Sequence, residues 1–215
     1  MTRFQYASDQ SLMVYFGDSI DLDTHHRVLK LLRLLESQPV PGVRNLHPAY
    51  NSMLIVFDPL TQDHAGLERI LAGYLDRLEH VPLPVPRTVE IPVSYGGADG
   101  PDLNDVATHH QLSPERVIEL HSSAEYIVYF VGFVPGFAYL GGLPAALATP
   151  RLKAPRKRVP KGSVAIGGTH TGVYPFETPG GWRLIGKTSL EIFDPDSAEL
   201  SRLRIGDLVR FVPIA

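Results

Sequence analysis

Apolar residues in the first eighty positions follow two periods, one typical of strands and one typical of helices. Short apolar runs predict strands at 11–16, 43–50 and 53–57, and apolar stripes predict helices that begin at Asp21 or Asp23 and at Thr61 or Asp63. The predicted order, β-α-β-β-α, is most of a split βαβ unit. We therefore predict a small α+β domain over residues 1–80.

A proline-rich segment follows this region. Residues 81–86 read VPLPVP, with proline at every second position. Such alternation favours an extended, semi-rigid connector over a helix or an inner strand. We place a linker at residues 81–87 and a second domain at residues 88–215.

The second domain is predicted to contain many short strands and two helices near its start. Residues 88–95 alternate apolar and polar side chains, and Asp102 is placed to cap the first helix. The helices are predicted at 103–110 and 114–121, and later strands at 126–133, 164–166, 171–174, 183–186, 189–193 and 207–212. This pattern predicts a β-barrel or a β-sandwich.

The stretch from Gly132 to Gly186 concentrates glycine, proline and aromatic residues. It holds 11 of the 19 glycines, 7 of the 19 prolines and the single tryptophan of the chain. Glycine permits close approach of a backbone or ligand, proline pre-sets turns, and aromatic rings offer flat apolar walls. A basic run without an acid lies inside it, formed by Arg151, Lys153, Arg156, Lys157, Arg158 and Lys161. We interpret the stretch as a site for a small anionic ligand; the alternative is a barrel wall without a site.

Composition narrows the classes of function. The net charge of -3 argues against a dedicated nucleic-acid binder, because such proteins carry an excess of Lys and Arg. The absence of cysteine excludes disulfides and cysteine nucleophiles, and the histidines show no HExxH or comparable spacing, so no bound metal is expected. Neither a secretory pattern nor a membrane-length apolar run is present. We expect a cytoplasmic protein that binds neither nucleic acid nor membranes.

Residues 181–188, GWRLIGKT, satisfy the phosphate-binding pattern G-x-x-x-x-G-K-T. That motif requires a strand, a glycine-rich loop and a following helix whose N–H groups cradle phosphate. Here the loop positions are bulky and the next residues, SLEIF, alternate as a strand. Two strands that meet at a Gly186 kink are the better interpretation, with Lys187 as a candidate charge lining the site.

Four segments resemble a known family closely: IPVSYGGADGPDL (91–103), VIELHSSAEYIVYFVGFVPGFAYLGGLP (117–144), LATPRLKAPRKRVPKGSVAIGG (147–168) and TGVYPFETPGGWRLIGKTSLEIFDP (171–195). They are similar to the B subunits of 5-oxoprolinases, also called the KipI type or allophanate hydrolase subunit 1, a carboxyltransferase-domain family. Residues 1–80 match more loosely, through FGDSID (16–21) and the order of elements.

The resemblance implies a C-terminal cyclophilin-like β-barrel and two partners, the A and C subunits of the same enzyme. The complex would open the lactam of 5-oxoproline (pyroglutamate) to glutamate with hydrolysis of ATP, supplied as Mg-ATP. This chain would be a hydrolase subunit that is inactive alone and carries neither metal nor biotin. Two alternatives stay open: a binding protein that inhibits a sensor histidine kinase, or a subunit related to carboxyltransferases and allophanate hydrolase.

The family motifs also imply site residues. His121, in IELHS, and Arg156, in PRKRVPKGSV, are the catalytic candidates, and no nucleophile is evident. The expected substrate-binding residues are Arg156, His170, Tyr174, Trp182 and Lys187. His170 stands where relatives commonly carry glutamine, which changes the hydrogen-bond donors and would add pH dependence. Lys161 stands where relatives often have a small residue.

Overall fold

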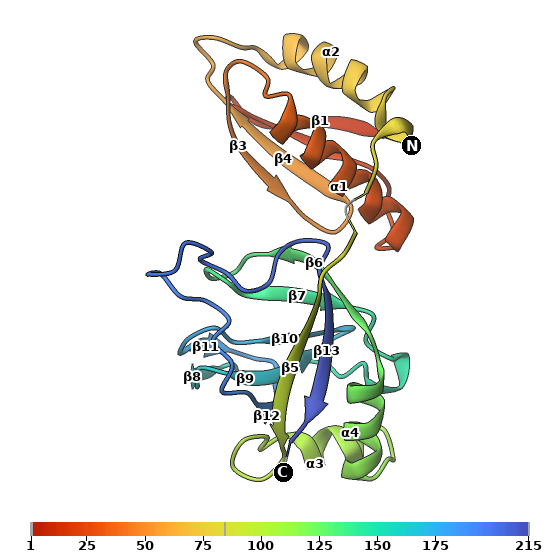
Figure 1. The fold of residues 1–215 in the computed structure, drawn as a ribbon, viewed down its shortest axis with the longest axis vertical. Coiled ribbons are helices and arrows are strands. Elements are labelled where there is room, and N and C mark those ends of the chain that lie inside the picture. Colours follow the sequence, from red (N-terminus) through yellow and green to blue (C-terminus); the bar gives the residue numbers. More distant parts are fainter. Residues whose placement is uncertain (1, 84, 215) are drawn as a thin grey trace. The chain divides into compact units, whose positions relative to one another are not determined.

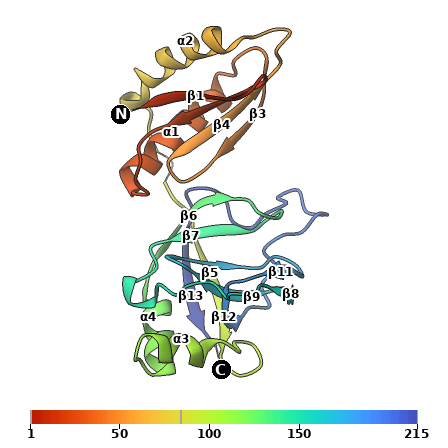
Figure 2. The ribbon, with the colours of Figure 1, turned by 180° about the vertical axis from the view of Figure 1, so that it is seen from behind.

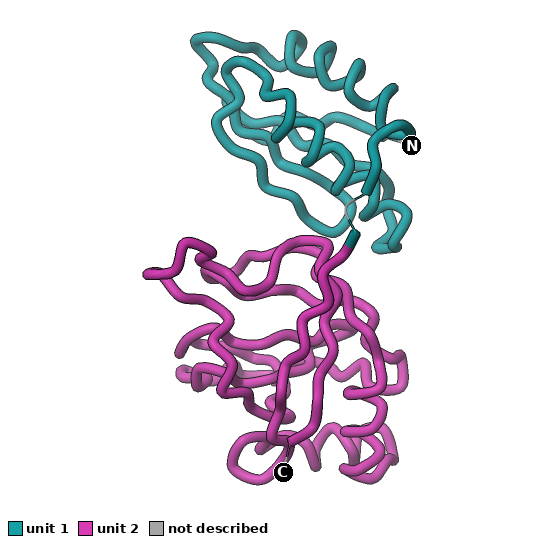
Figure 3. Tube along the Cα trace, in the orientation of Figure 1, with its two compact units in different colours: residues 1–85 teal, residues 86–215 magenta. Residues whose placement is uncertain are grey.

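The computed structural model describes residues 2–83 and 85–214. The chain divides into two compact units, residues 1–85 and 86–215 (Figure 3). The sequence-based bounds of the domains and of the linker at 81–87 stay predictions, and Pro84, Met1 and Ala215 lie outside the described residues. None of the described helices is both long and apolar enough to cross a membrane.

The first unit is a sheet with two helices. Its elements are β1 (Arg3–Ser8), β2 (Ser11–Tyr15), α1 (Leu22–Ser37), β3 (Val43–Pro48), β4 (Ser52–Phe57), α2 (His64–Leu75) and a 3-10 turn (Leu78–His80). The strands lie in the order β1-β2-β4-β3, and each neighbouring pair is antiparallel. Because β4 lies between β2 and β3, the β2-α1-β3 crossover is split, which confirms the predicted α+β unit.

Local capping sets the starts of both helices in this unit. Asp21 Oδ1 accepts a hydrogen bond from the backbone N–H of Thr24 at 2.8 Å, and Asp63 Oδ1 accepts one from Gly66 at 2.6 Å. Strand β1 was not predicted: Phe4 and Tyr6 alternate with polar residues, but the run is short and its side chains are largely exposed. It forms an edge strand, held by backbone pairing with β2.

The second unit is a closed barrel with helices and a small additional sheet (Figures 1 and 2). Its elements are β5 (Thr88–Tyr95), α3 (Leu103–His109), α4 (Pro114–Ser123), β6 (Tyr126–Val131), β7 (Ala138–Gly141), a 3-10 turn (Ala145–Leu147), β8 (Arg156–Val159), β9 (Ser163–Gly167), β10 (His170–Val173), β11 (Thr178–Gly180), β12 (Arg183–Lys187) and β13 (Leu208–Pro213). The barrel order is β10-β7-β6-β13-β5-β12-β9, and β8 pairs with β11 beside it. The predicted α+β class with a C-terminal barrel is confirmed.

The barrel core follows the alternation of its strands. Ile91 and Val93 of β5, Val128 of β6, Ile166 of β9 and Val209 of β13 are fully buried, and they belong to one apolar cluster. Burial of such side chains contributes about 1.5–3 kcal/mol each relative to exposure. This cluster gives a rigid support for the loops and strands of the central stretch.

The prediction of a strand at residues 189–193 is wrong. The apolar positions of this segment still face the core, since Ile192 is buried and Leu190 is partly buried against it. The described backbone here forms only an isolated bridge between Phe193 and Ser201. The apolar alternation of residues 189–193 therefore reflects the burial of side chains. The backbone of this segment forms no strand because no neighbouring strand pairs with it.

Strand β12 clarifies the GWRLIGKT segment. No helix follows Lys187 in the described chain, so the rejection of a phosphate loop agrees with the structure. The expected meeting of two strands at Gly186 is wrong. One strand continues through Gly186, with an irregular register against β9 between Leu184 and Gly186.

Candidate functional site

A cavity of about 270 Å³ opens over the aromatic side chains of the central stretch. We call it the aromatic pocket, and it is lined by Phe133, Phe137, Tyr139, Arg151, Pro155, Tyr174, Pro179, Gly180, Gly181 and Trp182. Within this described set, Arg151 is the charged member. A mainly apolar pocket with a single cation suits a small ligand that has one apolar face and one anionic group.

Phe137 lies at the centre of the aromatic packing. Its ring centroid is 5.1 Å from that of Tyr139, 5.2 Å from Tyr174 and 5.4 Å from Trp182, each in an edge-to-face arrangement. Such pairs contribute about 0.5–1.5 kcal/mol beyond the burial of their area. The rings therefore hold one another in place, so the pocket is formed before any ligand enters.

Two glycines allow the rings to lie against the backbone. A Cβ atom on Gly167 would come within 2.4 Å of the Trp182 indole, and one on Gly180 within 2.3 Å of the Tyr174 hydroxyl oxygen. Any larger residue would clash with the ring and displace it. The interleaving of glycine and aromatic residues along the central stretch thus has a direct packing reason.

Arg151 carries the charge of the pocket. Its guanidinium carbon lies 5.7 Å from the Trp182 ring centroid, within cation–π range. Among the described residues, no carboxylate lies within ion-pair distance of Arg151. Burial raises the pKa of Tyr139 and Tyr174, and the nearby Arg151 opposes that rise in both. An exposed, unpaired guanidinium is available to a carboxylate or phosphate.

Phe133 stands at the rim of the pocket in an unusual conformation. Its φ is 70°, in the left-handed region that bulky residues rarely adopt, and the residue is 61% exposed. Its ring packs edge-on against Phe137 at 5.7 Å. Strain of this kind costs about 1–3 kcal/mol and concentrates at functional sites. The exposed side chain forms part of the rim of the aromatic pocket.

The expected site residues fall into separate environments. Tyr174 and Trp182 line the aromatic pocket, as expected of walls. His170 begins β10 beside it, and burial followed by the charge of Arg151 lowers the pKa of its imidazole. His170 is therefore neutral near pH 7. The expected pH dependence at this position would lie below neutrality.

Arg156 forms a structural ion pair through one of its guanidinium nitrogens. Its Nη2 donates to Asp102 Oδ1 at 2.7 Å, while Asp102 Oδ2 accepts from the backbone N–H of Leu184 at 2.7 Å. Asp102 does not cap α3 with its side chain, which corrects the sequence prediction. The pair joins β8, the start of α3 and β12. Its Nη1 is buried and has no hydrogen-bond partner among the described residues, and its charge acts on the phenol of Tyr174 in the aromatic pocket. Substrate binding by Arg156 therefore stays a prediction.

His121 is also held in the interior. It is fully buried, and its Nδ1 lies 2.8 Å from the Tyr95 hydroxyl and its Nε2 2.9 Å from Thr171 Oγ1. Burial lowers the pKa of His121 to about 3, so the ring is neutral. Both nitrogens face core partners, and the ring does not reach the aromatic pocket. This arrangement favours a structural role over catalysis.

Lys187 lies apart from the aromatic pocket. It ends β12 opposite Ser163 and Ser94, five residues from Trp182 and thus roughly 16 Å along an extended strand.

Sequence reasoning missed Arg151, Phe133, Phe137 and Tyr139 as individual residues of the candidate site. Their signal was present in FVPGFAY and in the basic run, but only the fold selects which residues of those runs share a cavity.

The described residues contain no group of three or more His, Asp or Glu side chains arranged to hold a metal ion. The side-chain donors that line the aromatic pocket are one guanidinium, one indole N–H and two phenol groups. This donor set suits hydrogen bonding to an anion and gives no ligands for a divalent cation.

Residues 2–203 match the family described as "Carboxyltransferase domain, subdomain C and D". Barrel and match together define a carboxyltransferase-domain protein. The chain is 41% identical over 227 residues to the 5-oxoprolinase B subunit of Bacillus subtilis (strain 168), covering 99% of this chain and 93% of that protein. It is 48% identical over 216 residues to the protein of the same name from Escherichia coli O157:H7, covering 98% and 95%. The chain belongs to the family of 5-oxoprolinase B subunits, which confirms the resemblance in its motifs.

Solved structures share the fold. The crystal structure of TTHA0988 superposes with a TM-score of 0.83 at 37% identity, and the match covers 100% of this chain and 40% of that one. This chain therefore spans less than half of that longer polypeptide. The K. lactis urea amidolyase has a TM-score of 0.80 at 20% identity, which is a likeness of fold.

Proposed function

We propose that this chain is the B subunit of an ATP-dependent 5-oxoprolinase, a hydrolase that opens the lactam of 5-oxoproline to glutamate together with its A and C subunits. Two relatives that match nearly the whole chain, at 41% and 48% identity, carry the name of that subunit. The urea amidolyase of Saccharomyces cerevisiae is only 23% identical, so the carboxyltransferase alternative has weaker support.

The chemistry explains the need for ATP. A five-membered lactam is a stabilised amide, and its carbonyl carbon is a poor electrophile. Transfer of the γ-phosphoryl group to the lactam oxygen releases ADP and makes that carbon reactive toward water. One water opens the C–N bond and a second releases phosphate, so the products are glutamate, ADP and phosphate. The protein must hold the lactam and neutralise its carboxylate while this occurs.

The aromatic pocket supplies those two needs, and the unpaired guanidinium of Arg151 on an apolar cavity is the observation that carries the proposal. The lactam ring would lie against Phe137 and Trp182, where water is excluded. Its carboxylate would accept hydrogen bonds from Arg151. Tyr139 and Tyr174 remain protonated because burial raises the pKa of both phenols, so each could donate to the lactam oxygen.

Nucleotide enters the proposal as a substrate of the complex. The segment that satisfies the phosphate-loop pattern is strand β12, so its N–H groups pair with strands and form no phosphate cradle. We therefore assign the Mg-ATP site to no residue of this chain. A lactam site without a nucleotide site accounts for a subunit that is inactive alone.

The test is reconstitution of this chain with the A and C subunits, followed by measurement of phosphate and glutamate from ATP and 5-oxoproline. Arg151→Ala should raise the KM for 5-oxoproline by about tenfold or more, because a charged hydrogen bond contributes about 1.5–3 kcal/mol. Lys153→Ala, a neighbouring cation outside the aromatic pocket, is the matched control.

Two failures have separate meanings. An assembled complex that releases no glutamate refutes the proposed activity. An active complex whose KM is unchanged by Arg151→Ala refutes the assignment of the carboxylate to the aromatic pocket.

A further inference from the structure

Strand β5 has one edge that is only partly paired. It runs parallel to β13 from Thr88 to Val93, but it pairs with β12 only at Ser94 and Tyr95. Within the described chain, no strand pairs with residues 88–92 on the β12 side. The barrel therefore closes at one end of β5 and leaves the other end of that edge open.

The hydrogen-bond pattern identifies the groups on the open edge. Leu208 N–H donates to Arg87 C=O at 2.8 Å, and Ile214 N–H donates to Val93 C=O at 2.9 Å, so odd-numbered residues face β13. Gly96 N–H donates to Ile185 C=O of β12 at 3.1 Å, so even-numbered residues face the opposite side. The open edge thus presents the backbone groups of Thr88, Glu90 and Pro92.

The position of Pro92 is consistent with the assignment of even-numbered residues to the open edge. Proline has no N–H, and within sheets it is confined to positions whose N–H would point away from the ladder. Two N–H donors remain on the open edge, those of Thr88 and Glu90, and both residues are exposed. Unpaired strand edges of this kind pair readily with another chain.

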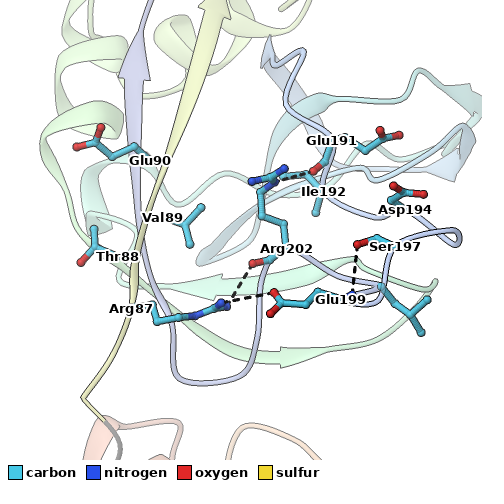
Figure 4. Close-up of a pocket in the computed structure, with 11 residues that line it drawn as sticks. Arg87, Thr88, Val89, Glu90, Glu191, Ile192, Asp194, Ser197, Glu199 and Arg202 are labelled. Atoms are coloured by element: carbon cyan, nitrogen blue, oxygen red, sulfur yellow. Dashed lines mark hydrogen bonds and ion pairs between the residues drawn. The ribbon is translucent and has the colours of Figure 1, made fainter.

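A cavity of about 500 Å³ lies along this edge (Figure 4). We call it the β5 groove. One wall is residues 87–90, and the other is formed by residues of the segment 191–202. The second wall is held by two backbone hydrogen bonds, from Arg202 N–H to Ile192 C=O and from Asp194 N–H to Leu200 C=O, each of 2.9 Å. The open edge therefore faces a built groove.

The groove is acidic. Its lining includes Glu90, Glu191, Asp194 and Glu199 against Arg87 and Arg202. Arg87 is already neutralised, because its Nη2 donates to Asp207 Oδ2 at 2.6 Å and its Nε to Oδ1 at 3.0 Å.

Two of these carboxylates lack a cation. Glu191 pairs with Lys161, and Glu199 pairs with Arg204 and, at 3.9 Å, with Arg87. Glu90 and Asp194 have no ion pair among the described residues. Arg202, the other cation of the lining, also has no ion pair among the described residues, so two carboxylates stand against one cation. An occupant with a lysine or arginine side chain would balance the remaining negative charge.

We propose that the β5 groove receives an extended, basic segment of the C subunit, which adds as a strand to the open edge of β5. This inference rests on the proposed function for the existence of that partner. Strand addition supplies main-chain hydrogen bonds to Thr88 and Glu90, and the acidic lining selects the basic side chains of the segment. The interaction is independent of the aromatic pocket, whose lining shares no residue with the groove.

Hydrogen exchange on the complex tests the inference directly. Adding purified C subunit, without ATP or 5-oxoproline, should slow exchange of the Thr88 and Glu90 amides by at least tenfold. Unchanged exchange of both amides in a complex that has formed overturns the inference and leaves the proposed function standing. Slowed exchange that appears with increasing concentration of this chain alone indicates a second copy in the groove and also overturns it.

Glu90→Pro provides an independent variant. It removes one edge donor, and Pro92 shows that the strand accepts proline two residues further along the same edge. The Kd for the C subunit should rise about three- to tenfold beyond that of Glu90→Ala, which removes the carboxylate and keeps the N–H. Asp194→Lys should weaken binding as well, because it repels a basic segment. Equal Kd values for Glu90→Pro and Glu90→Ala overturn the inference.

The two proposals fail differently. A C subunit that binds and protects the edge, in a complete complex that yields no glutamate, refutes the activity alone. A C subunit that does not bind at all refutes both.

Discussion

Arg156 and Asp102, which are 54 residues apart in the sequence, form an ion pair with Nη2 and Oδ1 separated by 2.7 Å. The Asp102 side chain is only 6% exposed and also accepts the Leu184 N–H, so one carboxylate joins three segments of the barrel domain. One nitrogen of the Arg156 guanidinium is therefore occupied by the scaffold of the barrel domain, whereas its Nη1 has no hydrogen-bond partner among the described residues.

Replacing Arg156 by alanine should destabilise the protein. It leaves a buried carboxylate without its cation, and we expect the free energy of unfolding to fall by about 2 kcal/mol, less than the roughly 3–5 kcal/mol of a fully buried pair because the Arg156 side chain is 29% exposed. Urea unfolding of the isolated chain measures this. Arg158→Ala, whose partner Glu177 is exposed, should cost less than about 1 kcal/mol. Equal losses in the two variants would contradict the structural role.

Gly167→Ala should disturb the wall of the aromatic pocket. The added methyl group would meet the Trp182 ring at 2.4 Å, so we expect a loss of about 1–3 kcal/mol and a displaced indole. Because the chain has a single tryptophan, the shift of its fluorescence emission reports that displacement. Gly73→Ala in α2, where no atom lies within 4 Å, should leave the emission unchanged and stabilise the helix by about 0.5–1 kcal/mol.

Buried His121 should make stability depend on pH. Its folded pKa is about 3, whereas a histidine in the unfolded chain titrates near 6.5, so the unfolded state binds more protons between these values. Its contribution is complete above pH 6.5 and declines as the pH falls, by about 2 kcal/mol from pH 7 to pH 5.

The His121→Gln variant measures this contribution. Its loss of stability from pH 7 to pH 5, obtained from urea unfolding at both values, should be smaller than that of the wild type by about 2 kcal/mol. Part of the pH dependence remains, because burial also lowers the pKa of His110 and His170. His80→Gln, at an exposed position, should keep the wild-type dependence. An unchanged dependence in His121→Gln would show that the ring is accessible to protons in the folded state.

Phe133→Gly should separate ligand binding from stability. The side chain is 61% exposed and its φ is 70°, so glycine relieves strain and stability should not fall. If the ring covers the lactam, the KM for 5-oxoproline should rise about fivefold, equivalent to about 1 kcal/mol of lost apolar contact. The measurement is steady-state kinetics of the reconstituted complex, with thermal unfolding of the isolated chain as the control. An unchanged KM would place the ligand elsewhere.

Local signals predicted much of the fold. The capping residues Asp21 and Asp63 and the apolar stripes of α1 and α2 act within a few residues, so they can be recognised without a partner. Asp102 was different. Its position before α3 suggested a cap, but a distant guanidinium competes for the same carboxylate. The strand expected at 189–193 was wrong for a similar reason, since pairing depends on what lies beside the segment.

The sequence by itself determined the α+β class, the barrel, the family, and the stretch that holds the candidate site. It also showed that GWRLIGKT is no phosphate loop, because bulky residues stand where glycines are needed. Only the tertiary structure decided which members of that stretch act together. Cations one or two positions apart on a strand or loop point in different directions, so Arg151 meets Trp182 while Arg156 is drawn to Asp102. A cavity is formed by residues distant in sequence, and their separation in space is set by packing.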